Sequence, residues 1–235
     1  MKFLLLTALL FSTQVIAWSV TPMSQDIKPG QRTFQIKIIN KEGVAPVALR
    51  LKVMSRDINE FGGDKLTNTN DLLVFPKRMM VPAGKQLIAR ISVRKPNSSN
   101  HEKAYRLIVD QIPVKNTTDK NGIQVLTRYL TSVYLNPKQP KKVDFKIDSA
   151  SIKASNIEIM ATNNGNYHKV LLLSSINIGG TDIQTKIDPK NVLPGKSLKI
   201  LLPVEHQKFK SGDILSFQNT CMICPKDESY QIPLN

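Results

Sequence analysis

Hydrophobic and polar residues alternate with a period of two along most of this chain. The clearest runs are residues 33–38, 47–53, 87–93 and 105–109. This period places successive side chains on opposite faces of a strand, one for a core and one for water. Turn-forming residues separate the runs, among them Pro29-Gly30, Gly62-Gly63 and Pro82-Ala83-Gly84. Short strands at this spacing predict an all-β protein built from β-sandwiches.

The pattern divides the chain into two domains. Residues 122–135 form the longest strand candidate, and the prolines at 137 and 140 follow it directly. Two prolines this close stop strand pairing and stiffen the path of the chain. Alternation then restarts in runs at 143–147, 157–162, 169–178, 183–187, 197–204 and 214–217. We therefore predict a first sandwich at 18–137, a basic linker at 138–142 and a second sandwich at 143–235.

The first seventeen residues have the features of a cleavable signal peptide. Lys2 supplies a positive start, residues 3–11 form an apolar stretch, and the small residue Ala17 suits signal peptidase. The apolar stretch is too short to span a bilayer, and no later stretch is long enough to do so. The sequence thus predicts an exported protein that is not inserted in a membrane.

The chain is strongly basic, with a formal net charge of +15 at pH 7. A basic surface favours acidic neighbours such as nucleic acid, anionic lipid or an acidic protein. Aromatic residues make up only 6% of the chain, and no paired-aromatic motif for base stacking is present. We therefore expect no nucleic-acid partner.

Several segments together resemble one protein family. Residues 70–76 read Asn-Asp-Leu-Leu-Val-Phe-Pro and precede the Pro82-Ala83-Gly84 turn and Arg90; residues 105–113 read Tyr-Arg-Leu-Ile-Val-Asp-Gln-Ile-Pro. In this order they are similar to the periplasmic chaperones of the chaperone–usher pathway. The resemblance implies two immunoglobulin-like β-sandwich domains in a boomerang arrangement. It also implies a periplasmic chaperone that binds a pilin or fimbrial subunit by donor-strand complementation and delivers it to an outer-membrane usher.

Such a chaperone needs an edge strand with apolar side chains at alternate positions. The resemblance places this donor strand before the linker, on the face formed by Ile123, Val125, Thr127, Tyr129, Thr131 and Val133. On the alternation alone, the last strand of a domain packing on its own core is the favoured interpretation of this segment, and the resemblance reverses that preference. An open edge of this kind also allows two copies of the chain to pair.

The sequence departs from the family at the residues that bind the subunit's terminal carboxylate. The family pattern has an Arg in the first strand and a Lys in the donor strand, whereas alignment places Ser24 and Ser132 here. Guanidinium groups bind carboxylates through two parallel hydrogen bonds, so other arginines are candidates for the anchor. Those in the matching strands, Arg90 and Arg106, rank first, followed by Arg94 and Arg128.

None of the remaining motifs indicates an enzyme. Cys221 and Cys224 are expected to form a hairpin disulfide, because no helix follows them as a redox motif requires. The three histidines lack ligand spacing, and no nucleophile elbow or phosphate loop is present, so we predict no metal, cofactor or catalytic residue. The alternative function is a secreted structural or adhesive surface protein with the same two-sandwich build.

Overall fold

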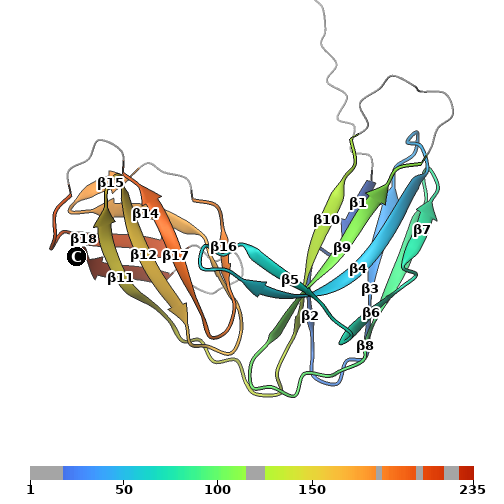
Figure 1. Cartoon of the computed structure of the whole chain (residues 1–235), viewed down its shortest axis with the longest axis horizontal. Helices are drawn as coiled ribbons and strands as arrows, with labels where there is room; N and C mark the ends of the chain where they lie inside the picture. Colours follow the sequence, from blue (N-terminus) through green and yellow to red (C-terminus); the bar gives the residue numbers. More distant parts are fainter. Residues whose placement is uncertain (1–17, 115–124, 184–186, 205–208, 220–227) are drawn as a thin grey trace, which may run out of the picture.

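Two β-sandwiches meet at an angle and give the molecule the shape of a boomerang (Figure 1). The computed structural model describes residues 18–114, 125–183, 187–204, 209–219 and 228–235, and within these it contains strands and no α-helix. The first sandwich ends with Leu135 and the second begins with Phe145. The sequence therefore predicted the all-β, two-sandwich fold correctly, and the proposed linker at 138–142 lies in the interval without strands.

The first domain consists of two facing sheets. One has the order β1 (Trp18–Thr21), β3 (Thr33–Asn40), β8 (Gln86–Val93) and β6 (Leu72–Phe75). The other has the order β2 (Ser24–Ile27), β10 (Arg128–Leu135), β9 (Lys103–Ile112), β4 (Val47–Ile58) and β5 (Asp64–Asn68), with β7 (Arg78–Val81) also paired to β4. The chain changes sheets between β1 and β2 at Pro22, which has no N–H to continue a ladder.

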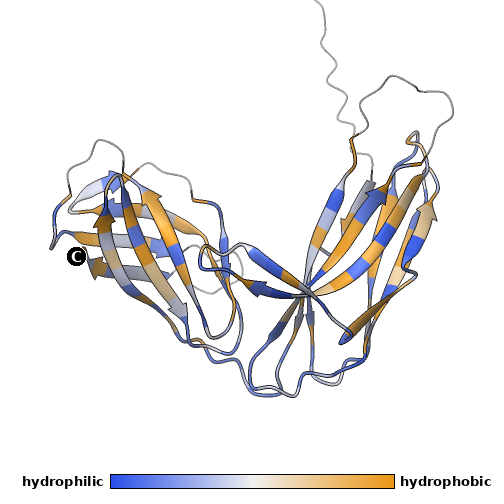
Figure 2. Cartoon of the chain, in the orientation of Figure 1, coloured by the Kyte–Doolittle hydropathy of each residue, from blue (hydrophilic) through white to orange (hydrophobic). Residues whose placement is uncertain are grey.

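Strict alternation along the strands builds the core between these sheets. In β3 the side chains of Phe34, Ile36 and Ile38 are 7%, 1% and 0% exposed, while the polar residues between them face solvent. Figure 2 shows the same apolar and polar banding along the neighbouring strands. Burying each such side chain contributes about 1.5–3 kcal/mol, so the core fixes the register of every strand that contributes to it.

The second domain is also built of antiparallel strands, which form three sheets in the described part of the chain. Its sheets have the orders β11 (Phe145–Lys153), β12 (Asn156–Asn163), β17 (Lys196–Pro203); β13 (Lys169–Leu171), β16 (Lys190–Val192); and β15 (Thr181–Ile183), β14 (Leu173–Ile178), β18 (Ile214–Asn219), β19 (Glu228–Pro233). The prediction of a single strand at 169–178 is wrong, since the chain changes sheets at Leu172. The N–H of Leu172 donates to the side-chain Oδ1 of Asn219 at 2.8 Å, which separates β13 from β14.

The hairpin of β4 and β5 extends from the first domain onto the second (Figure 1). At its tip the carbonyl of Glu60 accepts a hydrogen bond from the N–H of Lys199 at 2.6 Å. Asp57 and the ammonium of Lys196 form an ion pair at 2.7 Å. Ile58 and Tyr134 belong by sequence to the first domain, yet they pack in the hydrophobic cluster of the second. The angle between the domains is therefore held by both apolar and polar contacts.

Candidate functional site

Strand β10 is only partly covered by its neighbours. It pairs with β9 along its whole length, from Arg128 opposite Asp110 to Leu135 opposite Lys103. On its other side β2 covers only residues 132–135, because the parallel pairing begins with Ser132 opposite Ser24. Within the described part of the chain, residues 128–131 thus have no strand on that side, and we call this edge the open rim.

The backbone hydrogen bonds show which polar groups face the open rim. Gln111 donates its N–H to the carbonyl of Thr127 at 3.0 Å, while the N–H of Ser132 turns the other way and donates to Met23 at 2.9 Å. The backbone N–H and C=O groups of odd-numbered residues in this segment therefore point toward β9. Those of even-numbered residues point toward the side on which β2 lies. The N–H and C=O groups of Arg128 and Leu130 consequently point outward, where an added strand would pair with them.

The predicted donor face is only partly accessible. Tyr129 packs on Trp18 with ring centroids 4.6 Å apart, and Thr131 and Val133 are each 1% exposed in the core of their own domain. The prediction that these last two side chains fill a partner's groove is corrected, because the opposite sheet already covers them. Val125 is 80% exposed and Thr127 is half-buried, so this end of the face is free; Ile123 lies outside the described residues.

Exposed apolar side chains border the open rim on its other face. Leu126 and Leu130 are 44% and 41% exposed. The donor face predicted from the sequence did not include Leu126 or Leu130. Their exposure next to unpaired backbone groups shows that both faces of the strand offer apolar contacts here, since large exposed side chains in a group are typical of interaction surfaces.

The open rim ends at a small basic cluster. Ser132 lies opposite Ser24 on one side and opposite Arg106 of β9 on the other, so the two serines that replace the family's cations are direct neighbours. The guanidinium of Arg106 donates from Nη1 to the hydroxyl of Ser132. This places a cation at the point where β2 begins and the rim stops.

Asp64, the first residue of β5, joins this cation to a second one. Its carboxylate lies 2.6 Å from Nε of Arg106 and 2.7 Å from Nε of Arg56. Burial by itself raises the pKa of Asp64, but hydrogen bonds from Arg106 and Arg56, and their charges, outweigh it and lower the pKa below its usual value. The folded state therefore favours the ionised form of Asp64.

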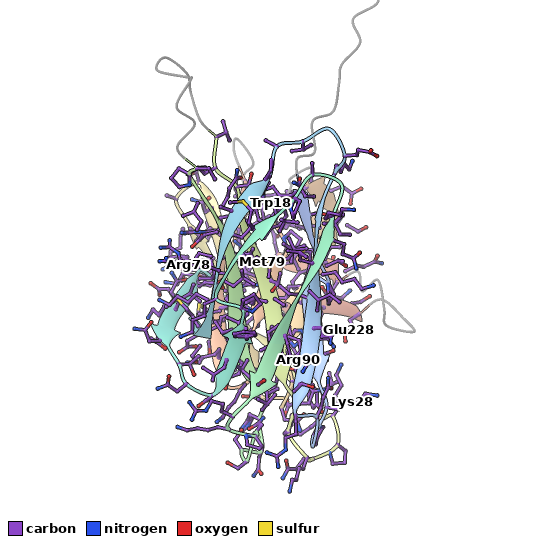
Figure 3. The ribbon with its side chains drawn as sticks, turned by 90° about the vertical axis from the view of Figure 1, so that its right-hand side faces the viewer. Trp18, Lys28, Arg78, Met79, Arg90 and Glu228 are labelled. Atoms are coloured by element: carbon purple, nitrogen blue, oxygen red, sulfur yellow. The ribbon has the colours of Figure 1, made fainter. Side chains whose placement is uncertain are left out.

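The other candidate arginines are placed differently. Arg90 is exposed on β8 in the opposite sheet, on the side that faces the viewer in Figure 3, so its first ranking beside Arg106 is wrong. Arg94 follows the same strand and is exposed. Arg128 lies on β10 itself, is 63% exposed and forms an ion pair with Asp110. Only Arg106 both reaches β10 and lies at the end of the open rim.

A polar contact between the domains lies directly behind this cluster. The hydroxyl of Tyr134 accepts hydrogen bonds from Arg56 at 3.2 Å and from Asn191 of the second domain at 2.8 Å. The ring of Tyr134 stacks on His168 with centroids 3.8 Å apart, and Nδ1 of His168 lies 2.9 Å from the buried carboxylate of Glu102. Sequence reasoning missed these residues. The one available signal was Arg56, which interrupts the apolar alternation of β4.

The remaining predictions concern metals, membranes and the cysteines. Among the residues that the structure describes, no three His, Cys, Asp or Glu side chains gather as metal ligands. Nor does any helix in that part of the chain have the length and apolar character needed to cross a bilayer. Cys221 and Cys224 lie outside the described residues, so their disulfide remains a prediction.

Comparison with known proteins identifies the family. The model of "Pili and flagellar-assembly chaperone, PapD N-terminal domain" matches residues 23–141, just over half of the 235-residue chain. No curated protein matches the chain. The matched interval covers most of the first sandwich and defines an assembly chaperone, with a second sandwich following it. The chain belongs to the PapD-like chaperones of the chaperone–usher pathway, a family of chaperones and not of enzymes.

Solved structures with this fold are similar to the chain over nearly its whole length. The chaperone–tip subunit complex CsuC–CsuE of archaic Csu pili from Acinetobacter baumannii gives a TM-score of 0.61 at 13% identity, covering 93% of this chain and 98% of that one. The SafA pilin–SafB chaperone complex of Salmonella enterica gives 0.62 at 12%, covering 95% and 99%. The class 5 fimbriae chaperone CfaA gives 0.58 at 16%, covering 93% and 99%. At these identities the likeness extends to the fold alone.

Proposed function

We propose that this protein captures an incomplete pilin-like subunit in the periplasm by pairing the open rim of β10 with it, and then delivers it to an outer-membrane usher. The observation that carries the proposal is the half-covered strand, with unpaired backbone groups at Arg128 and Leu130 and a neighbouring strand that begins only at Ser24. A subunit that lacks a strand exposes an apolar groove and open sheet edges, and an added strand covers both.

The position of Arg106 favours one direction of pairing. A partner strand parallel to β10 would bring its carboxyl end to residue 132, where β2 blocks further pairing and the Arg106 guanidinium lies. An antiparallel strand would bring an ammonium group to the same guanidinium, and the two like charges would repel. Arg106 is therefore our candidate anchor for the subunit's terminal carboxylate, in place of the serines at 24 and 132.

Two of the solved relatives are complexes of a chaperone with a pilus subunit, CsuC–CsuE and SafA–SafB. Their likeness to this chain in fold supports a partner of the same kind. Val125, Thr127 and the exposed Leu126 and Leu130 would supply the apolar contacts, each large buried side chain contributing about 1.5–3 kcal/mol. Ile123 remains part of the proposed donor strand.

The test removes a single backbone donor from the open rim. Leu130→Pro deletes the N–H that points outward and leaves the ladder to β9 intact, since proline is tolerated on edge strands in this orientation. Tagged protein expressed in its source cell should co-purify one-to-one with an otherwise unstable subunit. The amount of co-purified subunit should be at least tenfold lower with the Leu130→Pro variant. Leu130→Val, which keeps the N–H, is the matched control.

Two further variants separate side-chain contacts from backbone pairing. Val125→Asp should reduce subunit recovery, whereas Val170→Asp, at an exposed valine of β13 in the second domain, should not. Equal recovery with Leu130→Pro and Leu130→Val would contradict strand pairing. Recovery of the protein from surface fractions without a subunit would support the adhesive alternative, and a Leu130-dependent dimer on gel filtration would show that the rim pairs with itself.

A further inference from the structure

The Arg56–Asp64–Arg106 cluster contains two cations and one anion. The side chain of Arg56 is 2% exposed, and that of Arg106 is 17% exposed. Within the described residues only Asp64 forms an ion pair with either of them. The cluster thus has one more positive charge than it has carboxylates, and Arg106 is its more accessible guanidinium.

The hydrogen bonds of Arg106 show how it is oriented. A guanidinium has five N–H donors in a rigid plane. Asp64 accepts from Nε at 2.6 Å and from Nη2 at 3.3 Å, and Ser132 accepts from Nη1. Two donors remain, one on Nη1 and one on Nη2, and a carboxylate binds a guanidinium through such a pair.

Asp64 is itself held from the side of the domain interface. Arg56 donates to it at 2.7 Å and also donates to the hydroxyl of Tyr134, which in turn accepts from Asn191 of the second domain. The carboxylate is therefore fixed by a buried cation that cannot turn to solvent. A side chain fixed in this way can orient a longer and more mobile one beside it.

We infer that Asp64 is a positioning residue for the carboxylate anchor: it fixes the Arg106 guanidinium so that its two remaining donors bind the terminal carboxylate of a subunit. This inference rests on the proposed function. The alternative role for Asp64 is that of a competitor, because Asp64 is an anion and would compete with an incoming carboxylate for the Arg106 guanidinium. The two roles predict opposite changes in carboxylate affinity when Asp64 is removed. Removing a competitor strengthens carboxylate binding, and removing a positioning residue weakens it.

The experiment measures discrimination between a carboxylate and an amide. The probe is a nine-residue peptide of alternating threonine and valine with an amino-terminal fluorophore, made as the free acid and as the carboxyl-terminal amide. Its affinity is measured by fluorescence anisotropy with the full-length protein. Wild type should prefer the free acid by about tenfold, as expected for a hydrogen bond between charged groups. Asp64→Asn should reduce that ratio to about one.

Matched variants make the result specific to position. Asp64→Glu should restore part of the preference, because it keeps a carboxylate acceptor for both guanidiniums. Asp57→Asn, on the same hairpin but paired with Lys196, should leave the preference unchanged. Arg106→Gln should abolish it, as a direct anchor requires.

The outcomes separate this inference from the proposed function. A ratio that is unchanged or increased in Asp64→Asn overturns the positioning role. Equal binding of acid and amide by wild type also overturns it, while strand capture stands as long as the Leu130→Pro variant loses binding. Absence of peptide binding in wild type, together with absence of a co-purified subunit, removes the proposed function and this inference with it.

Discussion

The two domains are built around the same corner, but the binding edge proposed above lies in the first. In each, the second strand of a sheet ends in a buried asparagine: Nδ2 of Asn40 donates to the carbonyls of Ala45 and Val81, and Nδ2 of Asn163 to those of Tyr167 and Val192. A glycine with positive φ follows in both facing turns, Gly84 at 66° and Gly195 at 69°. The shared corner therefore builds a sandwich and does not by itself create a site.

The difference lies in what the first domain adds to this frame. Its β4–β5 hairpin brings Asp64 across to Arg106 and also contacts the second domain. Its strand β10 keeps residues 128–131 uncovered, because β2 is only four residues long. In the second domain β19 pairs along its whole length with β18 and has no further strand of that sheet beside it in the described chain, so an open edge alone does not distinguish the two domains. The site proposed above thus lies in these additions, and the corners supply rigidity.

The largest effect is expected from breaking the shared corners. Asn163→Ala removes both amide donors and also the Oδ1 acceptor for the N–H of Gly165, so we expect a loss of about 3 kcal/mol of unfolding free energy. Asn40→Ala should cost about 2 kcal/mol, because Oδ1 of Asn40 has no partner in the described structure and its loss removes nothing.

Trp18, the single tryptophan, lies in the core of the first domain, so its fluorescence reports on that domain during urea unfolding. Circular dichroism follows both domains. Asn40→Ala should shift the fluorescence transition, and Asn163→Ala should shift circular dichroism more than fluorescence. Equal shifts in both signals for both variants would show that the domains unfold as one unit.

A smaller effect is expected at the cluster that only the first domain has. Asp64→Asn should cost about 2 kcal/mol at neutral pH, less than a fully buried ion pair would, because solvent reaches part of the carboxylate. The pKa of Asp64 is lowered in the folded state, so its contribution is complete above the unfolded pKa of about 4. It is lost as pH falls further through the folded pKa.

The stability difference between wild type and Asp64→Asn should therefore be constant from about pH 7 to pH 5 and shrink below about pH 4. Urea titrations at several pH values measure it directly. A difference that grows toward low pH would contradict the assignment of Asp64 as a stabilised anion.

Alternation along the chain was sufficient to predict the frame. Residues 33–38 lie inside β3, 87–93 inside β8 and 105–109 inside β9, since period-two burial is a local property of a strand. Ser24 and Ser132, which the resemblance aligns with the family's two cations, are register partners in the structure.

The binding edge could be predicted only in part. Which face of β10 is covered depends on where Trp18 and β2 pack, and these lie more than a hundred residues away along the chain. The contact of Asp64 with Arg106 spans 42 positions and arises from the β4–β5 hairpin, so no local spacing reveals it. Arg90 was ranked beside Arg106 for the same reason. The sequence does not show which of the two sheets a strand joins, and Arg90 lies on β8 in the sheet opposite β10.

The smallest effect is expected at the contact that couples the two domains. Tyr134→Phe keeps the stacking on His168 and removes the hydroxyl that accepts from Arg56 and Asn191, at a cost of about 1 kcal/mol. Because that hydroxyl joins a side chain of each domain, its loss should separate the fluorescence and circular dichroism transitions.

Tyr129→Phe is the matched control, since its hydroxyl donates only to the carbonyl of Trp18 within the first domain. It should lower the fluorescence midpoint by a similar amount without widening the interval between the two transitions. If the two variants behave alike, the polar contact behind the anchor does not couple the domains, and the angle between them depends on the β4–β5 hairpin contacts and on the apolar packing of Ile58 and Tyr134.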